Sequence, residues 1–216
     1  MKAIDIVNEI LFEAEEEETS SEEDIKKNKG IIVFDIDDTI VKAKNLRIKS
    51  KDGEKELTPT EFAQLSNEEK NKDWDFSDFR NFDKLFSSIV TGTPVIGNLK
   101  MLDSYYNKGW DIGFLTARGV EAANKKAIVQ WLKIRDKIDN KLKAIQPSRI
   151  KFFAAVNDPA RLKETGGMTP GAAKKYYLNK LKEKYEVVKF VDDDETFIKK
   201  AKEVLPAKDV IKARIK

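Results

Sequence analysis

The sequence predicts an α/β fold, in which a doubly wound parallel sheet carries helices on both of its faces. Largely apolar runs of strand length at residues 31–34, 110–115 and 187–191 alternate with segments of helical spacing, and this alternation is typical of the fold. A strand that is buried in a parallel sheet reads as a nearly continuous apolar run. Each run also ends in polar residues, which is where such sheets place their functional groups.

The first of these runs ends in two closely spaced acids, Asp35 and Asp37. Two carboxylates one residue apart repel each other unless a cation or a shared proton compensates, so the arrangement is unfavourable without a function. The sequence therefore predicts a metal site or a catalytic pair at the end of the first strand.

Residues 42–93 form a long interval before the next unit of helix and strand, and we expect a small insert there. Residues 47–50 and 54–57 flank a Lys-Asp-Gly turn and predict a β-hairpin. The Thr-Pro-Thr-Glu sequence at 58–61 predicts the start of a helix, with a threonine cap, a proline in the first position and a glutamate that completes a capping box.

The second half of this insert is rich in aromatic residues. They are Trp74, Phe76, Phe79, Phe82 and Phe86. Such side chains could stack on nucleobases, because every base offers an aromatic face. We favour the other interpretation, in which they form the apolar interior of the insert and seal it to the rest of the domain.

The remaining segments continue the alternation. Helical spacing predicts helices over 94–108 and 120–140, and the apolar run at 152–156 predicts a short buried strand. Residues 157–171 are rich in glycine, proline and polar residues, which predicts a mobile loop. A last strand is expected at 209–213.

Four short motifs follow one another along the chain. They are Asp35-x-Asp37-x-Thr39 after the first strand, Thr116 at the end of the second, Lys174 with Leu178 and Leu181 in a helix, and Asp192-Asp193 after the third strand. Their order resembles the signature of the haloacid dehalogenase (HAD) superfamily of phosphotransferases, over roughly residues 30–216. Lys175 stands beside Lys174 and remains an alternative for the third motif. The resemblance implies a Rossmann-like, HAD-like phosphatase domain in which the insert, residues 42–93, forms a small cap over the active site.

The resemblance also implies a reaction through an aspartyl-phosphate and assigns roles to individual residues. Asp35 would be the nucleophile and Asp37 the acid–base residue. Thr116 and Lys174 would hold the phosphoryl oxygens. Arg118 would contribute to substrate binding.

A Mg²⁺ cofactor with oxygen ligands is part of the same implication. The ligands would be the Asp35 carboxylate, the Asp37 backbone carbonyl and Asp193, with Asp192 as the alternative to Asp193. Thr39 either contacts substrate or, as we favour, braces its own turn.

Within the superfamily, the spacing of the segments looks most like the phosphatase module of bacteriophage polynucleotide kinase-phosphatases, which removes phosphate from the 3′ ends of nucleic acids. No Gly-x-x-x-x-Gly-Lys-Ser/Thr motif for a kinase half occurs in the sequence. We therefore expect a magnesium-dependent phosphomonoester hydrolase that acts on nucleotide or nucleic-acid phosphate ends. Two alternatives stay open: a phosphatase for small metabolites, and a non-catalytic module that binds phosphate or a partner.

Composition limits the chemistry that this chain can perform. Its 216 residues include no cysteine and no histidine, which excludes disulfides, thiol nucleophiles and the usual zinc ligands. An enzyme of this composition has to work with carboxylates. Without an apolar run of about 18 residues or a secretory signal, we expect a soluble, cytoplasmic protein that has no membrane partner.

Residues 1–29 differ from the rest in charge. They hold ten acids and four lysines, a net charge of −6, so residues 30–216 carry +9 of the total of +3. We expect an amphipathic helix followed by an acidic, disordered leader. The Leu-Phe-Glu sequence at 11–13 loosely resembles the cleavage site of leaders that direct proteins into phage capsids, which would imply packaging in a virion. The basic remainder suits a phosphate-rich substrate.

Overall fold

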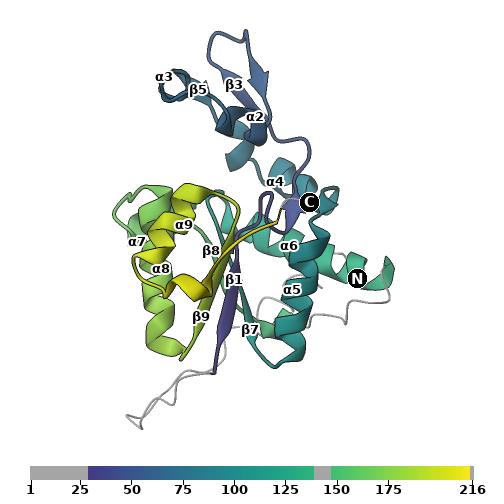
Figure 1. Ribbon diagram of the computed structural model, residues 1–216. Coiled ribbons are helices and arrows are strands. Elements are labelled where there is room, and N and C mark those ends of the chain that lie inside the picture. Colours follow the sequence, from purple (N-terminus) through teal and green to yellow (C-terminus); the bar gives the residue numbers. More distant parts are fainter. Residues whose placement is uncertain (1–28, 139–146, 215–216) are drawn as a thin grey trace.

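The structure is a computed structural model that describes residues 29–138 and 147–214 (Figure 1). The amphipathic helix and the acidic segment expected before residue 29 lie outside the described residues. The same holds for the last two residues of the helix expected over 120–140.

Five parallel strands form the central sheet, in the order β10-β9-β1-β7-β8 (Figure 1). They are β1 (Ile31–Phe34), β7 (Asp111–Thr116), β8 (Ile150–Ala155), β9 (Val188–Asp192) and β10 (Val210–Lys212). Strand β1 lies at the centre of the sheet and is buried along its whole length, as its apolar sequence predicts. The predicted α/β fold with a doubly wound parallel sheet is confirmed.

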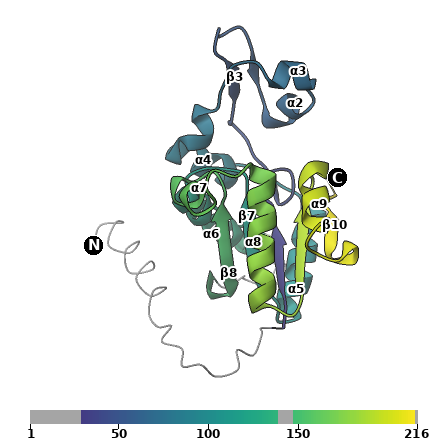
Figure 2. The same ribbon diagram turned by 90° about the vertical axis from the view of Figure 1, so that its left-hand side faces the viewer.

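Helices cover both faces of this sheet (Figure 2). They are α5 (Ile96–Asn107) and α6 (Glu121–Ile138) on one face, and α8 (Pro170–Lys184) and α9 (Glu195–Lys202) on the other. Because successive strand residues point to opposite faces, Ile32 and Phe34 pack in the core with α5 and α6, whereas Ile31 and Val33 pack with α8 and α9. Within the part of the chain that the structure describes, no helix is both long and apolar enough to cross a membrane.

The insert is a separate small unit that stands beyond the carboxyl ends of the central strands (Figures 1 and 2). Its elements are β3 (Ile48–Ser50), β4 (Glu56–Leu57), α2 (Pro59–Ala63), α3 (Asn67–Lys70), β5 (Trp74–Asp75) and the 3₁₀-helix η1 (Ser77–Arg80). The predicted hairpin is present as β3 and β4, and β5 adds a third antiparallel strand. The predicted capping box is present too: the Thr58 side chain accepts from Glu61 N, and the Glu61 carboxylate accepts from Thr58 N.

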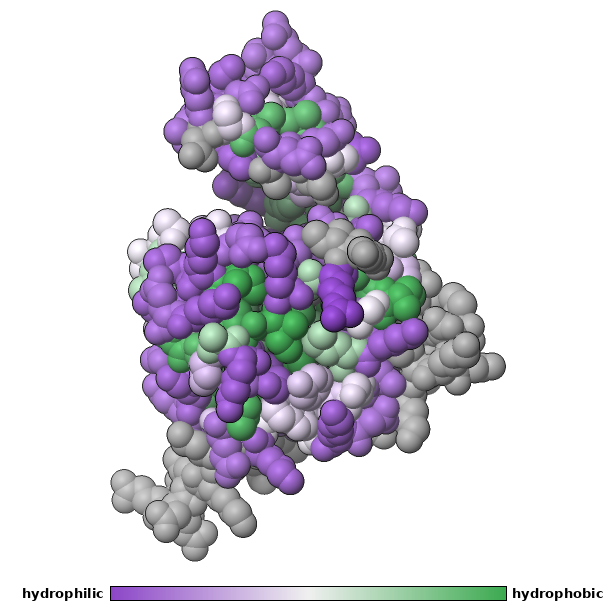
Figure 3. Space-filling model, in the orientation of Figure 1, coloured by the Kyte–Doolittle hydropathy of each residue, from purple (hydrophilic) through white to green (hydrophobic). Residues whose placement is uncertain are grey.

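Short elements fasten the insert to the rest of the protein. Strands β2 (Val41–Lys42) and β6 (Thr93–Pro94) pair antiparallel at its base, and helix α4 (Phe82–Val90) leads the chain back and packs on α6. The buried carboxylate of Asp78 joins both connections, since it accepts from Arg47 N (3.1 Å) and from Lys84 Nζ on α4 (2.5 Å). Hydrophilic side chains cover most of the visible face of the insert (Figure 3).

The aromatic residues of the insert do not form one interior cluster. Trp74 is buried and packs edge-on against Phe62, with ring centroids 5.4 Å apart, as the favoured interpretation expects. In contrast, Phe76 and Phe82 keep 38% and 40% of their surface exposed, and Phe82 stacks on Phe86 along α4. Phe76 also packs edge-on against Phe62, with ring centroids 5.4 Å apart. The interpretation as a sealed interior is therefore wrong for Phe82 and holds only in part for Phe76.

The loop predicted over residues 157–171 is also wrong, because a short helix, α7 (Pro159–Glu164), lies within it. The Asp158 side chain caps this helix by accepting from Ala160 N, and Pro159 occupies a first-turn position where its missing N–H is no loss. An Asp-Pro pair marks a turn as readily as a helix start, which explains the error. Turns remain at both ends of this helix, at Asn157 and at the Gly-Gly pair 166–167, whose φ angles are 62° and 73°.

Candidate active site

The predicted site residues come together at the carboxyl edge of three adjacent strands. Asp35 follows β1, Thr116 ends β7 and Asp192 ends β9. Asp35 N donates to the Val191 carbonyl (2.9 Å), so the backbone of the first acid is still held by the sheet. The order of strands therefore places carboxylates that are far apart in the sequence side by side.

Lys174 lies in the middle of these acids, at the start of α8. Its side chain is only 1% exposed, and Nζ donates to Asp35 Oδ1 (2.7 Å) and to Asp192 Oδ2 (2.8 Å). The Phe197 ring covers the ammonium, with its centroid 4.0 Å away. Lys175 points elsewhere and pairs with Glu203 on the surface (2.6 Å). Of the two lysines that the sequence left open, only Lys174 lies at the site.

Three carboxylates gather at this point, two of them bonded to the Lys174 ammonium. Asp35, Asp192 and Asp193 each offer an oxygen atom, and these atoms all lie within 4.8 Å of one another. Burial raises the pKa of Asp35 well above its usual range and also raises the pKa of Asp192, although Lys174 opposes both shifts. Burial and the charge of Asp192 raise the pKa of Asp193 to about 6. The excess of negative charge fits a hard divalent cation, which prefers oxygen ligands.

The ammonium group itself stays charged in this environment. Burial disfavours the charged form, but the carboxylates of Asp192 and Asp35 outweigh it and raise the pKa of Lys174 above its ordinary value. Lys174 thus supplies a fixed positive charge beside Asp35, and Arg118 supplies a second one at Asp37.

Thr39 is buried and acts within the loop that follows β1. Its hydroxyl donates to Asp193 Oδ1 (3.0 Å), and its carbonyl accepts from Asn98 Nδ2 on α5 (2.7 Å). The loop turns back sharply, since Ile40 N and Val41 N both donate to the Ile36 carbonyl. The sequence favoured a threonine that braces its own turn; in the structure its hydroxyl bonds instead to Asp193, on another strand end, and contact with substrate stays a prediction.

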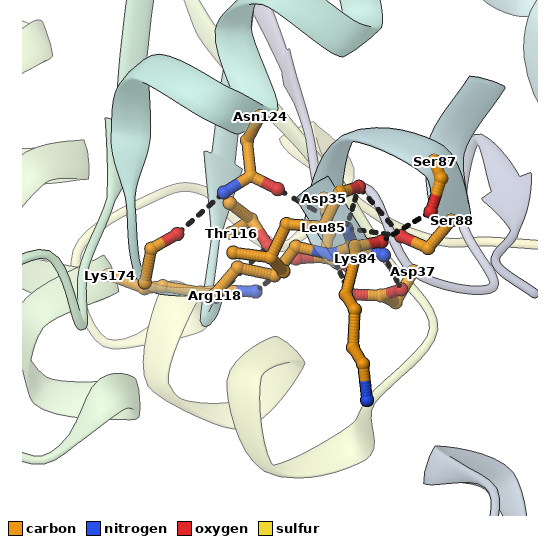
Figure 4. Close-up of polar contacts among 11 residues, drawn as sticks. Asp35, Asp37, Lys84, Leu85, Ser87, Ser88, Thr116, Arg118, Asn124 and Lys174 are labelled. Atoms are coloured by element: carbon orange, nitrogen blue, oxygen red, sulfur yellow. Dashed lines mark hydrogen bonds and ion pairs between the residues drawn. The ribbon is translucent and has the colours of Figure 1, made fainter. Parts of the chain in front are cut away.

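Arg118 and Asp37 form a bidentate ion pair (Figure 4). Arg118 Nε donates to Asp37 Oδ2 (2.8 Å) and Nη2 donates to Asp37 Oδ1 (2.6 Å). The arginine is 1% exposed, whereas the aspartate keeps 29% of its side-chain surface open. The structure therefore pairs Arg118 with Asp37. Direct contact of Arg118 with substrate stays a prediction.

Thr116 lies beneath this pair, fully buried at the end of β7. Its Oγ1 accepts from Arg118 N (3.3 Å), so the hydroxyl proton remains available to a further acceptor.

Sequence reasoning missed two polar residues behind the arginine, Ser88 and Asn124. Both are fully buried, and both accept a hydrogen bond from Arg118 Nη1. Ser88 stands between Leu85 and Ile89 on the apolar side of α4. A polar residue on the buried face of a helix needs a hydrogen-bond partner. The position of Ser88 within an apolar helical pattern could therefore have identified it from the sequence.

A hollow of about 550 Å³ opens on the insert, away from the acids. Its lining combines cationic and aromatic side chains with two acids: Lys49, Lys51, Lys55, Arg80, Trp74, Phe76, Glu56 and Asp75. Some of this charge is balanced, since Lys49 lies 3.9 Å from Glu56 and Lys51 lies 3.0 Å from Asp73. The sequence pointed to these aromatics but did not place them beside the lysines of the hairpin.

Comparison of the chain with protein-family models, with curated proteins and with solved structures finds no match to any of them.

Proposed function

We propose that the protein is a magnesium-dependent phosphomonoester hydrolase of the HAD type, which reacts through an aspartyl-phosphate. One observation carries the proposal: the buried ammonium of Lys174 is shared by Asp35 (2.7 Å) and Asp192 (2.8 Å) at the carboxyl edge of adjacent parallel strands. A nucleophilic carboxylate beside fixed positive charge is what transfer of a phosphoryl group needs.

In the first half of the reaction, an Asp35 oxygen attacks phosphorus and forms an O–P bond while the bond from phosphorus to the leaving oxygen breaks. Asp37, as the general acid, supplies a proton to that oxygen, so the products are an alcohol and the aspartyl-phosphate. In the second half, Asp37 takes a proton from water, and the resulting hydroxide oxygen bonds to phosphorus. The Asp35–phosphorus bond breaks, which releases inorganic phosphate and restores both acids.

Lys174 and Thr116 are suited to hold the non-bridging phosphoryl oxygens. The lysine offers a charged donor and the threonine a hydroxyl proton, and both are fixed before substrate arrives. Donors that need not reorganise during the reaction stabilise the charge of the transition state most effectively.

Mg²⁺ would be held by the carboxylates of Asp35, Asp192 and Asp193 and by the backbone carbonyl of Asp37. When bound, it neutralises charge on the phosphoryl oxygens and relieves the repulsion among the acids. The fit rests on the three carboxylate oxygens that lie within 4.8 Å of one another.

The substrate class that we propose is a phosphate at a nucleotide or nucleic-acid end. Its support is the hollow on the insert, where Lys49, Lys51 and Arg80 lie beside Phe76, because cations and exposed rings suit the backbone and the bases of a single strand. We place this activity inside the cell, since a chain without cysteine suits a reducing compartment.

Release of phosphate from para-nitrophenyl phosphate, with and without Mg²⁺, tests the reaction. Wild type should release phosphate only with the metal, and Asp35→Asn should be inactive while its circular dichroism spectrum is unchanged. Para-nitrophenol is a small leaving group, so 3′-phosphorylated and 5′-phosphorylated oligonucleotides and β-glycerol phosphate are tested beside it. If wild type and Asp35→Asn behave alike on every substrate, the protein is not a phosphatase of this kind.

A further inference from the structure

The guanidinium of Arg118 is held on both sides. On one side, Nε and Nη2 donate hydrogen bonds to Asp37 (Figure 4). On the other side, Nη1 donates to acceptors on helices α4 and α6. There Nη1 faces three acceptors: Ser88 Oγ at 3.0 Å, Asn124 Oδ1 at 3.2 Å and the Leu85 carbonyl at 3.4 Å. A planar donor group that is held at both ends cannot rotate away from the carboxylate.

The acceptors behind the arginine are themselves fixed. The Ser88 hydroxyl donates its proton to the Leu85 carbonyl (2.8 Å). A lone pair of Ser88 Oγ therefore points towards Arg118. Asn124 Nδ2 donates to the carbonyls of Gly119 (2.6 Å) and Val120 (3.0 Å), and these bonds leave its Oδ1 for the arginine.

The backbone at Val120 has an unusual conformation, which Asn124 stabilises. Val120 has a φ of 49°, a left-handed conformation that a β-branched residue rarely adopts. The Asn124 side chain and backbone both donate to its carbonyl (3.0 and 3.3 Å), so the strained turn is held by the residue that orients Arg118.

We propose that Ser88 and Asn124 are positioning residues for the acid–base step. They fix Arg118, which aims the Asp37 carboxylate at the leaving oxygen. Because Ser88 belongs to α4, the helix that returns the chain from the insert, the attachment of the insert becomes part of the catalytic machinery. This inference rests on the proposed function. It concerns one step only, the proton transfer by Asp37, which Ser88 and Asn124 would affect through Arg118.

A test follows from the leaving group. An aryl phosphate such as para-nitrophenyl phosphate expels a stable anion and needs little protonation, whereas the alkoxide of β-glycerol phosphate must be protonated as it leaves. A residue that only stabilises the fold would affect both substrates equally. A residue that positions Asp37 affects the alkyl phosphate selectively.

The variants are Ser88→Ala, which removes one acceptor of Arg118, and Ser87→Ala, its control on the same helix. Ser87 Oγ donates to the Lys84 carbonyl (3.2 Å) and does not contact Arg118 in the structure. For Ser88→Ala we expect kcat/KM on β-glycerol phosphate to fall about tenfold, a fraction of the effect of general acid catalysis. On para-nitrophenyl phosphate kcat/KM should change less than about twofold, because its leaving group needs little protonation, and Ser88→Thr should restore most of the loss.

Equal losses of kcat/KM on the two substrates, or no loss on either, would overturn the inference. Asn124→Leu should show the same selectivity, and thermal unfolding identifies any variant that has simply failed to fold.

A second measurement needs no activity. Nuclear magnetic resonance follows the Arg118 Nε–H, assigned by its loss in Arg118→Lys, and its exchange with water should accelerate severalfold in Ser88→Ala but not in Ser87→Ala. Unchanged exchange would also overturn the inference. Inactivity of wild type on every substrate would instead contradict the proposed function, and the exchange rates would then decide alone whether α4 holds Arg118.

Discussion

Lys174 is the residue whose contacts bear most directly on the site. Its buried ammonium donates to Asp35 and to Asp192, and a ring of Phe197 covers it. Breaking a buried ion pair by removing one partner costs about 3–5 kcal/mol, because the other charge is left uncompensated. Here two carboxylates would lose their common partner while Asp193 stays beside them.

Replacing this lysine should therefore affect activity and stability together. In Lys174→Ala we expect kcat to fall at least about 10²-fold, as when an oxyanion donor is removed. The free energy of unfolding in urea, measured without Mg²⁺, should fall as well. Lys175→Ala is the matched control, since its exposed pair with Glu203 is worth about 0–1 kcal/mol. A larger loss of activity in Lys175→Ala would mean that the wrong lysine has been assigned.

Mg²⁺ should stabilise the folded chain, because only folding gathers the carboxylates of Asp35, Asp192 and Asp193. A ligand at 100 times its Kd adds about 2.7 kcal/mol, which is visible as a rise in the melting temperature that EDTA reverses. Asp193→Asn should weaken this rise. Asp83→Asn, at an exposed acid of α4, should leave it intact, and an equal rise in both variants would contradict the role of Asp193.

At the scale of elements, Glu164 ties helix α7 to helix α8. Its carboxylate accepts from Tyr177 Oη (2.7 Å) and Lys180 Nζ (3.0 Å) on α8, and from Arg161 on its own helix (3.2 Å). The Tyr177 hydroxyl, with Lys180 and Arg161, lowers the pKa of Glu164 to about 2. This cluster holds the segment that the sequence assigned to a loop.

The lowered pKa predicts how stability depends on pH. The ionised form is favoured in the folded state, so its contribution is complete above the ordinary pKa of 4.5 and is lost as the pH falls from there towards 2. After allowance for solvent screening we expect Glu164→Gln to cost about 1–2 kcal/mol at pH 7 and progressively less below pH 4.5. Urea unfolding across pH measures this, with Glu183→Gln on α8 as control. A constant difference from pH 7 to 3 would exclude the electrostatic origin.

On the scale of the whole molecule, the insert stands beyond the carboxyl ends of the central strands (Figures 1 and 2), and the acids lie at that same edge of the sheet. Strands β2 and β6 and helix α4 attach the insert there. Asp78 accepts hydrogen bonds from the chain that enters the insert, at Arg47, and from the helix that leaves it, at Lys84. Under the proposed function, an anionic chain in the hollow of the insert would lie beyond the carboxyl edge of the sheet, which is the edge that carries the acids.

Charge reversal in that hollow should reveal the substrate class. Lys49→Glu with Arg80→Glu should raise KM for long 3′-phosphorylated oligonucleotides by about tenfold or more, and should reduce its dependence on salt. KM for a 3′-mononucleotide should hardly change. Lys184→Glu with Lys202→Glu, in the last turns of α8 and α9, makes the same change of net charge and is the control. If wild type prefers small phosphates and the double variant is unaffected, the substrate is a small metabolite.

Much of the framework was determined by the sequence alone, because its signals are local. Buried parallel strands have to be apolar on both faces, so β1 and β9 are readable as runs, and each acid is placed by the strand that it directly follows. The hairpin and the Thr58–Glu61 capping box depend on neighbours within a few positions. For the same reason the strands that carry Asp35 and Asp192 were predicted correctly, to within one residue at their ends, while the roles of both acids stay predictions.

Only the tertiary structure decided which of these residues meet. Lys174 contacts Asp35 across 139 positions and Arg118 contacts Asp37 across 81, and both contacts follow from the order of strands and the packing of helices. The same packing split the aromatic residues between a buried Trp74 and an exposed Phe76. A local pattern states what a residue can do, but its partner is set by contacts between distant segments, which no short stretch of sequence encodes.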